Sequence, residues 1–373
     1  MAQATINIPA APVRAVLTGG GTGGHLFPGV AICRELEQRC PGTQILFIGT
    51  GRPLERKVMS AAGYPHALIT VKGFKGMEPI RQLMALSVLP GSVLKAAAIL
   101  WRFKPQVVIG VGGYAAGPVC LAAYLLRIPV CLQEQNLLPG ITNRLLARLA
   151  RRIYIAFEDH SACFPADKVL LTGNPVREEI RRLADAPQPE RTSGSFTILI
   201  VGGSQGAHGI NAAVAEMLAC ACGQNSIRFI HQTGADDLAR MRQAYQAANL
   251  KADVRPFFDD MHRQYQHADL VVCRAGATTV AELTCIGKPM IFIPFPHAAD
   301  NHQELNARLL VEKGAGDMLS EAELTGLILW EKICHYHENP AELARMAAKA
   351  RALGQPEAAA AIVSDMVDRV IRS

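Results

Sequence analysis

The stretch GGGTGGHLFPGVA, residues 19–31, decides the fold, because it joins the apolar run VRAVLT at 13–18 to the helix-like segment ICRELEQ at 32–38. Glycine adopts backbone conformations that other residues avoid, and it lets the chain approach a ligand closely. A glycine-rich turn between a strand and a helix is typical of doubly wound α/β domains. The first six residues of the stretch also satisfy G-x-G-x-x-G, so a dinucleotide site is the first hypothesis.

A dinucleotide site also needs an acidic residue at the end of the second strand, about 20 residues beyond the loop, to bind the ribose hydroxyls. Here that strand, QILFIG at 44–49, is followed by TG and ends without a carboxylate. The hypothesis of a nicotinamide-dependent oxidoreductase is therefore weakened.

The same order of strand, glycine loop and helix recurs along the chain. Strand-like runs occupy 106–113, 128–134, 196–203, 227–234, 252–257, 268–276 and 288–296. Short strands that are apolar on both faces and alternate with helices indicate parallel sheets covered on both sides. The pattern opens at residue 13 and again at residue 196, after the polar linker-like segment LADAPQPERTSGS at 183–195. We therefore expect two doubly wound domains with a cleft between them.

Composition and charge limit the function classes. The 373 residues are 50% hydrophobic and 19% charged, which suits a soluble globular protein of two domains. Residues 1–177 contain 19 Lys and Arg against 8 Asp and Glu, whereas residues 178–373 contain 19 against 24. The basic half indicates an anionic partner, namely nucleic acid, a phosphorylated substrate or the inner face of a membrane; the alternative is a solvated basic surface.

The cysteines and the N-terminus indicate the compartment. The chain has ten cysteines without a C-x-x-C pair, and several stand singly in apolar segments: Cys33, Cys120, Cys131, Cys273 and Cys285. These are expected to be buried thiols. No basic and apolar export signal opens the chain, so we expect a cytosolic protein.

The segment LMALSVLPGSVLKAAAILW, 83–101, is nearly long enough to span a bilayer. Pro90, Gly91 and Lys95 within it argue against a transmembrane helix. Two interpretations remain: an apolar surface rimmed by positive charge that rests on anionic lipid, or a pair of helices partly buried in the core. The basic residues nearby are Lys72, Lys75, Arg81, Lys95, Arg102 and Lys104.

Three more glycine loops occur where a strand leads into a helix: GVGGYAAGP at 110–118, GGSQGAHGIN at 202–211 and RAGATTVAEL at 274–283. The free N–H groups of a helix's first turn suit phosphate oxygens, so four such loops indicate more than one phosphorylated ligand. The sequence contains no H-E-x-x-H and no D-x-D, and Asp259 and Asp260 are adjacent, so no metal site is expected.

Seven motifs together are more specific than any single loop. They are GGTGGHLFPGVA (20–31), GVGGYAAGP (110–118), QEQNLLPGITNR (133–144), TGNPVR (172–177), GGSQGAHGIN (202–211), CRAGATTVAEL (273–283) and PFPHAADNHQELNA (294–307). In order and spacing they resemble the MurG family, whose members transfer N-acetylglucosamine from its UDP derivative to complete the lipid-linked disaccharide precursor of bacterial peptidoglycan. The likeness runs from about residue 13 to about residue 350.

The resemblance implies a GT-B fold, an α/β architecture of two Rossmann-like domains with parallel sheets and an interdomain cleft. Residues 1–177 would form the acceptor-binding, membrane-facing domain, and a C-terminal helix at about 355–373 would pack back on it. Residues 178–354 would bind the UDP-sugar. The implied donor contacts are Thr22, Gly23, Gly24, Asn136, Arg177, Ser204, Phe258, Ala277, Thr278, Thr279, Val280, Ala281, Glu282 and Gln303.

Chemistry gives these positions plausible roles. Ser204 and the backbone at Ala277 and Thr278 are expected at helix starts, where they would bind the diphosphate. Glu282 is expected to accept the ribose hydroxyls, unless it is only a solvated helix carboxylate, and the backbone of Phe258 is expected to face uracil. Asn136 and Gln303 would bind sugar hydroxyls, and the acceptor's diphosphate would lie on Gly20, Gly21, Gly112, Gly113 and Tyr114.

The implied reaction is a single inverting displacement by the C4 hydroxyl of the muramoyl group. His25 is the candidate general base because histidine ordinarily titrates near neutral pH, although it would equally serve to orient the backbone or bind the diphosphate. Glu134 is the rival base. The chain departs from the family pattern at three positions: Gln133, often His; His208, often Arg; and Phe258, commonly aliphatic.

The expected partners are UDP-N-acetylglucosamine, the lipid-linked muramoyl-pentapeptide, the anionic inner membrane surface, and cell-wall synthesis and division proteins, with no nucleic acid, cofactor or metal. The expected location is the cytoplasmic face of the bacterial inner membrane. Two alternatives stay open: another GT-B glycolipid or antibiotic glycosyltransferase, and a catalytically silent UDP-sugar-binding protein.

Overall fold

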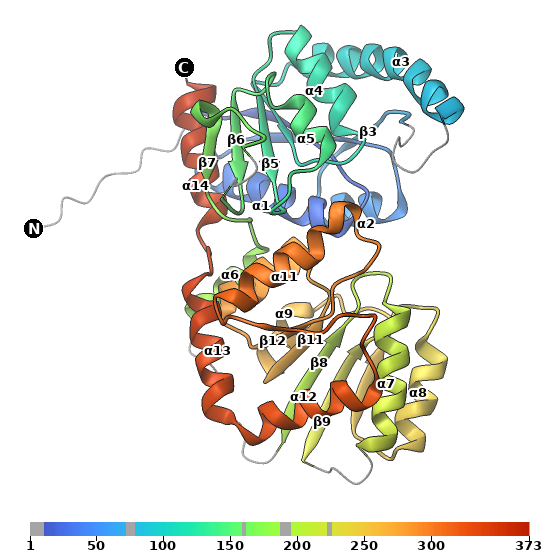
Figure 1. Ribbon diagram of the computed structural model, residues 1–373. Helices are drawn as coiled ribbons and strands as arrows, with labels where there is room; N and C mark the ends of the chain where they lie inside the picture. Colours follow the sequence, from blue (N-terminus) through green and yellow to red (C-terminus); the bar gives the residue numbers. More distant parts are fainter. Residues whose placement is uncertain (1–10, 72–78, 159–161, 187–194, 222–225, 373) are drawn as a thin grey trace, which may run out of the picture. The chain divides into compact units, whose positions relative to one another are not determined.

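The computed structural model describes residues 11–71, 79–158, 162–186, 195–221 and 226–372, which divide into two compact units (Figure 1). One unit is Met1–Arg177 with Glu357–Ser373, and the other is Glu178–Pro356. Lys72, Lys75 and most of the expected linker at 183–195 lie outside the described residues.

Within the described residues, the first unit contains a parallel sheet of seven strands in the order β3-β2-β1-β4-β5-β6-β7. The strands are β1 (Arg14–Thr18), β2 (Gln44–Gly49), β3 (His66–Leu68), β4 (Val107–Gly110), β5 (Val130–Glu134), β6 (Arg152–Ile155) and β7 (Val169–Leu171). The helices are α1 (Gly23–Arg39), α2 (Pro53–Ala62), α3 (Pro79–Phe103), α4 (Ala116–Leu125), α5 (Ile141–Leu146) and α14 (Ala358–Met366), which continues as a π turn, Val367–Ile371.

Alternate residues of the central strands face opposite layers of helices, as expected for a sheet that is buried on both sides. Leu17 and Ile109 pack in a core with α1, α2 and α14, whereas Val16 and Val108 pack in a core with α3 and α4. The last described segment thus completes the first unit: Ile362 and Met366 of α14 belong to the same core as Leu17.

The second unit repeats this plan with a parallel sheet in the order β10-β9-β8-β11-β12-β13. Its strands are β8 (Phe196–Val201), β9 (Ile227–Gln232), β10 (Ala252–Arg255), β11 (Leu270–Cys273), β12 (Met290–Phe292) and β13 (Asp317–Met318). Its helices are α6 (Glu178–Asp185), α7 (His208–Cys220), α8 (Leu238–Ala247), α9 (Met261–His267), α10 (Ala277–Ile286), α11 (His302–Glu312), α12 (Gly326–Glu338) and α13 (Pro340–Ala352). Helices α7, α8, α12 and α13 share one core with the sheet, and α9 contacts β8 and α6.

Two elements differ from the sequence-based expectation. Helix α1 begins at Gly23 and not near Ile32, so His25 lies in its first turn. Residues 83–101 lie in one continuous helix, α3, and not in a pair of helices. Along α3, Ala96 and Leu100 are buried while Leu94 and Trp101 are 71% and 70% exposed, so the helix has a core face and an exposed apolar face. None of the described helices is long and apolar enough to cross a bilayer.

Candidate functional site

The order of strands reverses between β1 and β4 in the first unit and between β8 and β11 in the second. In open α/β sheets, ligands bind beyond the carboxyl ends of the strands at such a reversal. All four glycine loops singled out in the sequence follow these four strands. The fold therefore predicts one ligand site in each unit, built from a pair of neighbouring glycine loops.

In the first unit the two loops meet backbone to backbone. Gly113 has a left-handed conformation (φ 79), and a Cβ atom there would collide with the carbonyl oxygen of Gly20. At Gly19 (φ 144) a Cβ atom would lie 2.5 Å from Val111 Cγ2. Glycine at these positions is therefore required by contact between the loops themselves.

Glu55 of α2 lies beside Gly20, where the two loops meet, and sequence reasoning missed this carboxylate. It is 2% exposed, and Oε2 accepts hydrogen bonds of 2.8 Å from the N–H groups of Thr50 and Gly51. A Cβ atom on Gly20 would collide with its Oε1. Gly21 is open by comparison, since among the described residues a Cβ there would have only Arg52 Nη1, at 3.6 Å, as a near neighbour. The carboxylate of Glu55 therefore occupies space beside Gly20 that an acceptor diphosphate was expected to reach.

His25 lies against the second loop of the first unit. Its Nδ1 atom is 2.8 Å from Gln135 Oε1, and a Cβ atom on Gly112 would lie 3.3 Å from its Cε1. The Nε2 atom has no hydrogen-bond partner among the described residues. The ring is partly exposed, so one nitrogen is held by the protein and the other remains open to a ligand.

Glu134, the rival base, is 2% exposed at the end of β5 and is surrounded by donors. Its Oε1 accepts from the N–H groups of Gln135 and Asn136, each at 3.0 Å. Its Oε2 accepts from the N–H of Gly140 at 3.0 Å and from Asn143 Nδ2 at 2.9 Å. These four donors tie Glu134 to the loop at 135–140 and occupy the lone pairs of its two oxygens. Its structural role is therefore to hold the shape of this loop.

In the second unit the loop after β8 forms a tight turn. Gly203 (φ 92) and Gly206 (φ 79) are both left-handed, and the N–H of Gly206 donates to the carbonyl of Gly203 at 3.1 Å. This turn places Ser204 four residues before α7, which begins at His208. The expectation that Ser204 stands at a helix start is therefore wrong. Its side chain is exposed.

Helix α10 begins at Ala277, four residues after β11 ends at Cys273, with Gly276 as its N-cap and no acidic residue in its first turn. Thr278, Thr279 and Ala281 are partly exposed, whereas Ala277 and Val280 are buried. The N–H of Val280 donates to the carbonyl of Gly276 at 2.9 Å. The N-terminal turn of α10 thus offers a positive dipole end next to partly exposed threonine side chains, which suits an anionic group.

Comparisons with known proteins agree over nearly all of the chain. Models of the glycosyltransferase family 28 N-terminal and C-terminal domains match residues 15–155 and 197–363. A Myxococcus xanthus protein named UDP-N-acetylglucosamine--N-acetylmuramyl-(pentapeptide) pyrophosphoryl-undecaprenol N-acetylglucosamine transferase is 46% identical, covering 97% of this chain and 94% of its own. A protein of the same name from Citrifermentans bemidjiense is 46% identical, covering 96% of this chain and 100% of its own.

The crystal structure of Acinetobacter baumannii MurG superposes with a TM-score of 0.75 at 32% identity, covering 96% of this chain and all of that one. This chain belongs to the MurG family. Structures of a kitacinnamycin glycosyltransferase and of a Neisseria meningitidis UDP-GlcNAc 2-epimerase have TM-scores of 0.68 and 0.66 at 18% and 16% identity, which shows the shared fold alone. The predicted GT-B fold is confirmed.

Several donor positions expected for a MurG family member lie in the first unit: Thr22, Gly23, Gly24, Asn136 and Arg177. Thr22 is the N-cap of α1 and makes no side-chain capping bond. The guanidinium of Arg177 lies over the ring of Phe27, 5.0 Å from its centre. A Cβ atom on Gly23 would lie 2.9 Å from the same ring, so the start of α1, Phe27 and Arg177 lie together.

At the MurG family's expected uracil position, the N–H of Phe258 is already engaged. It donates to Gln232 Oε1 at 2.9 Å, while Gln232 Nε2 donates to the carbonyl of Gly203 at 2.8 Å. Gln232, 2% exposed, therefore ties Phe258 to the loop of Ser204. Sequence reasoning missed Gln232 because it ends an ordinary strand. If the backbone of Phe258 contacts uracil, it must do so through its carbonyl group, because its N–H is bonded to Gln232.

Glu282 and Gln303 also have partners. Glu282 is 2% exposed and accepts from the hydroxyl of Tyr265 at 3.3 Å, so the alternative of a solvated carboxylate is wrong. Gln303 Oε1 accepts from the N–H of Phe295 at 3.0 Å, and no described residue bonds to its amide nitrogen, which suits a ligand. At His208, where the family often has Arg, Nδ1 lies 3.1 Å from Oδ2 of Asp237.

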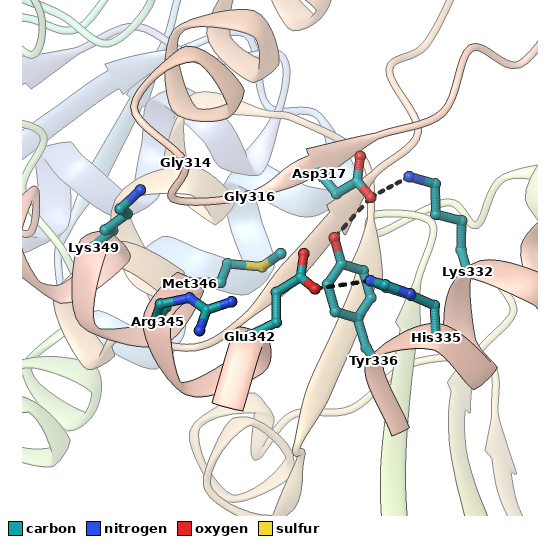
Figure 2. Close-up of a pocket in the computed structure, with 10 residues that line it drawn as sticks. All are labelled: Gly314, Gly316, Asp317, Lys332, His335, Tyr336, Glu342, Arg345, Met346 and Lys349. Carbon is teal, nitrogen blue, oxygen red and sulfur yellow. Dashed lines mark hydrogen bonds and ion pairs between the residues drawn. The ribbon is translucent and has the colours of Figure 1, made fainter. Parts of the chain in front are cut away.

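A cavity of about 400 Å³ lies elsewhere in the second unit, on edge strand β13 and helices α12 and α13 (Figure 2). Asp317 accepts from Lys332 Nζ at 2.5 Å and from the Tyr336 hydroxyl at 2.8 Å, and His335 pairs with Glu342 at 2.9 Å. Burial, followed by the bond to Asp317, raises the pKa of Tyr336. None of the residues expected to bind the donor lines this cavity.

The described residues contain no group of three or more His, Cys, Asp or Glu side chains placed to hold a metal ion. The cysteines expected to be buried are buried and free: Cys33, Cys120, Cys131, Cys273 and Cys285. Burial raises the pKa of Cys285 to about 11, so that thiol stays protonated near neutral pH.

Proposed function

We propose that this chain transfers N-acetylglucosamine from UDP-N-acetylglucosamine to the C4 hydroxyl of undecaprenyl-diphosphate-N-acetylmuramoyl-pentapeptide, which converts lipid I to lipid II in peptidoglycan synthesis. The observation that carries this assignment is the 46% identity to named transferases of this reaction across 97% of the chain. The two glycine-loop sites, one at each strand reversal, supply an acceptor site and a donor site.

The donor diphosphate binds the N-terminal turn of α10 in this proposal. The dipole of that helix and its partly exposed threonines replace the charge that a metal ion would supply. The amide of Gln303 and the carboxylate of Glu282 contact the sugar and ribose hydroxyls. We expect transfer to proceed unchanged in the presence of a chelator, and loss of activity on chelation would contradict the metal-free donor site.

His25 is the general base. The C4 hydroxyl attacks the anomeric carbon, its proton passes to Nε2 of His25, and the bond from the anomeric carbon to UDP breaks, which inverts the α-linkage to β-1,4. No described residue bonds to Nε2 of His25, which supports this role, whereas the four close donors around Glu134 argue against a base there. The acceptor's diphosphate lies on the open part of the loop, at Gly21 and the start of α1.

The test compares His25→Ala, Glu134→Gln and the exposed-histidine control His66→Ala, with labelled donor and a lipid-linked muramoyl-pentapeptide. We expect kcat to fall about 100-fold or more for His25→Ala and to be unchanged for His66→Ala. A larger loss of kcat for a folded Glu134→Gln than for His25→Ala would assign the base to Glu134.

A surface of the first unit supports attachment to the inner face of the membrane. Helices α3, α4 and α5 contact in turn and expose Leu94, Trp101, Tyr124, Leu125, Ile141 and Leu145. Exposed basic residues accompany them: Lys95, Arg102, Lys104, Arg127, Arg144, Arg148 and Arg151. Apolar side chains among cations are suited to a bilayer of anionic lipid. Contacts with cell-wall synthesis and division proteins stay a prediction.

Vesicle binding tests this surface, and Trp101 is a built-in probe. We expect its fluorescence to shift to the blue with vesicles containing phosphatidylglycerol and much less with phosphatidylcholine alone. Leu145→Glu should weaken vesicle binding without changing the fold, and Leu327→Glu, at an exposed leucine of the second unit, is the control. Equal binding of all three proteins to anionic vesicles would overturn the assignment of this surface.

A further inference from the structure

We propose that Gln135 is a positioning residue that fixes the imidazole of His25 in one tautomer, with the proton on Nδ1 and the lone pair on Nε2. This inference rests on the proposed function, in which Nε2 takes the proton of the attacking hydroxyl. A neutral imidazole carries its proton on either nitrogen, and only the other nitrogen accepts one. The protein must therefore choose the tautomer if His25 is to act as a base.

The orientation of the Gln135 amide is set by backbone carbonyls. Its Nε2 donates to the carbonyl of Val111 at 2.9 Å and to that of Gln133 at 3.3 Å. Turning the amide over would bring Oε1 against these two carbonyl oxygens, neither of which can donate. The side chain is 1% exposed, so water does not relieve such a contact. Oε1 of Gln135 is thus held toward His25.

A second amide extends the same arrangement. Gln133 Oε1 accepts from Gln135 Nε2, and Gln133 Nε2 donates to Asn174 Oδ1 at 3.0 Å. Each of the two glutamines accepts at Oε1 and donates from Nε2, so the series has one direction. Gln133 and Asn174 are 0% and 4% exposed. The series runs from His25 through Gln135 and Gln133 to Asn174 and contains only neutral amides beyond the imidazole.

The direction of the series decides the tautomer of His25. Gln135 Oε1 only accepts, and it lies 2.8 Å from Nδ1 of His25, so Nδ1 must carry the hydrogen. The edge of the ring that holds Nδ1 and Cε1 packs against Gly112, which is left-handed (φ 89) and leaves room for it. In the neutral ring the lone pair is therefore on Nε2, the nitrogen without a partner among the described residues.

Nitrogen NMR of the wild-type protein tests the tautomer directly and does not depend on activity. The protein is labelled with 15N-histidine, and the His25 signals are identified by their loss in His25→Ala. In the neutral ring we expect Nδ1 to have the 15N chemical shift of a protonated imidazole nitrogen and Nε2 that of an unprotonated one. A neutral ring with the proton on Nε2, or with the two tautomers equally populated, would overturn the proposal.

Replacement of Gln135 tests its role in fixing the tautomer. Gln135→Met keeps the length of the side chain but removes the acceptor, so both tautomers should appear. We expect kcat to fall about 10- to 100-fold while the KM for UDP-N-acetylglucosamine stays within about twofold, because Gln135 is 1% exposed and its amide is bonded to protein groups. Gln135→Glu restores an acceptor toward Nδ1 but sets its second oxygen against the carbonyls of Val111 and Gln133. We therefore expect the Nδ1–H signature to return while kcat recovers only in part.

Gln133→Met is the matched control. It removes the amide that contacts Gln135 but leaves Gln135 bound to the backbone carbonyls of Val111 and residue 133. We expect a smaller loss of kcat and an unchanged tautomer. If His25→Ala leaves kcat unchanged, the proposed base is wrong. If His25→Ala abolishes activity while a folded Gln135→Met keeps a single Nδ1–H tautomer and full kcat, the role of Gln135 alone is refuted.

Discussion

Glu134 shows how one buried carboxylate determines the shape of a whole loop. Three backbone N–H groups between Gln135 and Gly140 point at its two oxygens, and Asn143 of α5 adds a fourth donor. The loop carries Gln135 and Asn136 and leads into α5. The placement of His25 thus depends indirectly on Glu134, through the backbone that holds Gln135.

We predict that Glu134→Gln destabilises the protein by about 1–3 kcal/mol, because the new amide nitrogen would face backbone donors. Denaturant unfolding of the full chain measures the change. The control is Asp167→Asn, at an exposed carboxylate of the same unit, which should leave the free energy of unfolding unchanged. Equal stability of the two variants would contradict the structural role of Glu134.

His231 is the buried histidine of the second unit. It is 0% exposed, with Nε2 3.0 Å from Asn211 Oδ1 and Nδ1 3.2 Å from the Tyr245 hydroxyl. Burial lowers its pKa from 6.5 to about 3, with Asp237 opposing the shift. The folded chain therefore leaves His231 neutral in a range of pH where an unfolded chain protonates it.

We predict that acidification from pH 6.5 toward pH 3 lowers the free energy of unfolding of the second unit, since only the unfolded state binds a proton at His231. In His231→Gln this fall with pH should be shallower. Trp330, the tryptophan of the second unit, reports its unfolding in a Trp101→Phe background. The exposed-histidine control His267→Gln should keep the wild-type slope, and an equal slope in His231→Gln would refute the assignment.

Sequence reasoning found His25 because the histidine directly follows a recognisable loop. It missed Glu55, Gln135 as a partner, and Gln232, since each of these acts through a side-chain contact with a residue distant in sequence or with backbone. Glutamine and glutamate at strand ends and in helices are common, and no local pattern distinguishes those that bind a neighbouring loop. Their roles depend on three-dimensional neighbours that the sequence pattern does not encode.

Helix α1 illustrates the same limit at the level of elements. Its first seven residues include Gly23, Gly24, Pro28 and Gly29, which have poor helix propensity, so the pattern predicted a helix only from about Ile32. The structure extends it to Gly23 because the helix packs closely on the sheet. A Cβ atom on Gly29 would lie 2.8 Å from Leu17 Cδ1, so glycine is needed for this approach. Tertiary packing here outweighs propensity.

The contact between the two loops of the first unit predicts an unequal response to similar substitutions. Gly113→Ala should destabilise the first unit by about 2 kcal/mol or more, because the new methyl group meets the Gly20 carbonyl and the residue is left-handed. Gly91→Ala, at a helical position where no described atom lies within 4 Å of the new Cβ, should be neutral or stabilise by up to about 1 kcal/mol. Unfolding followed by circular dichroism compares them, and equal effects would contradict the loop contact.

At the scale of the molecule, the alternation of apolar strands and helices was enough to predict two doubly wound sheets, since both faces of every central strand are buried. The order of strands within each sheet was not available from that pattern. It follows from which strands pair, and it is this order that brings the loops after β1 and β4 into contact.

The attachment of α14 to the first unit depends on Asp365. Its carboxylate accepts two bonds of 2.8 Å from Arg152 of β6 and one of 3.1 Å from the Tyr154 hydroxyl. We predict that Asp365→Asn costs about 2–4 kcal/mol and raises hydrogen exchange in α14 and β6. Asp368→Asn, which alters a largely exposed pair with Arg372, is the control. Unchanged exchange in β6 for Asp365→Asn would contradict this attachment.

The position of α14 in the chain also has a consequence for biosynthesis. The core of the first unit needs Ile362, Val363 and Met366, which a ribosome adds only after the 178–356 segment. At typical translation rates that segment takes roughly 10 to 40 seconds to make. The unit that begins first thus waits with part of its apolar surface uncovered while the second unit is translated, and this interval is where nascent-chain chaperones have most to protect.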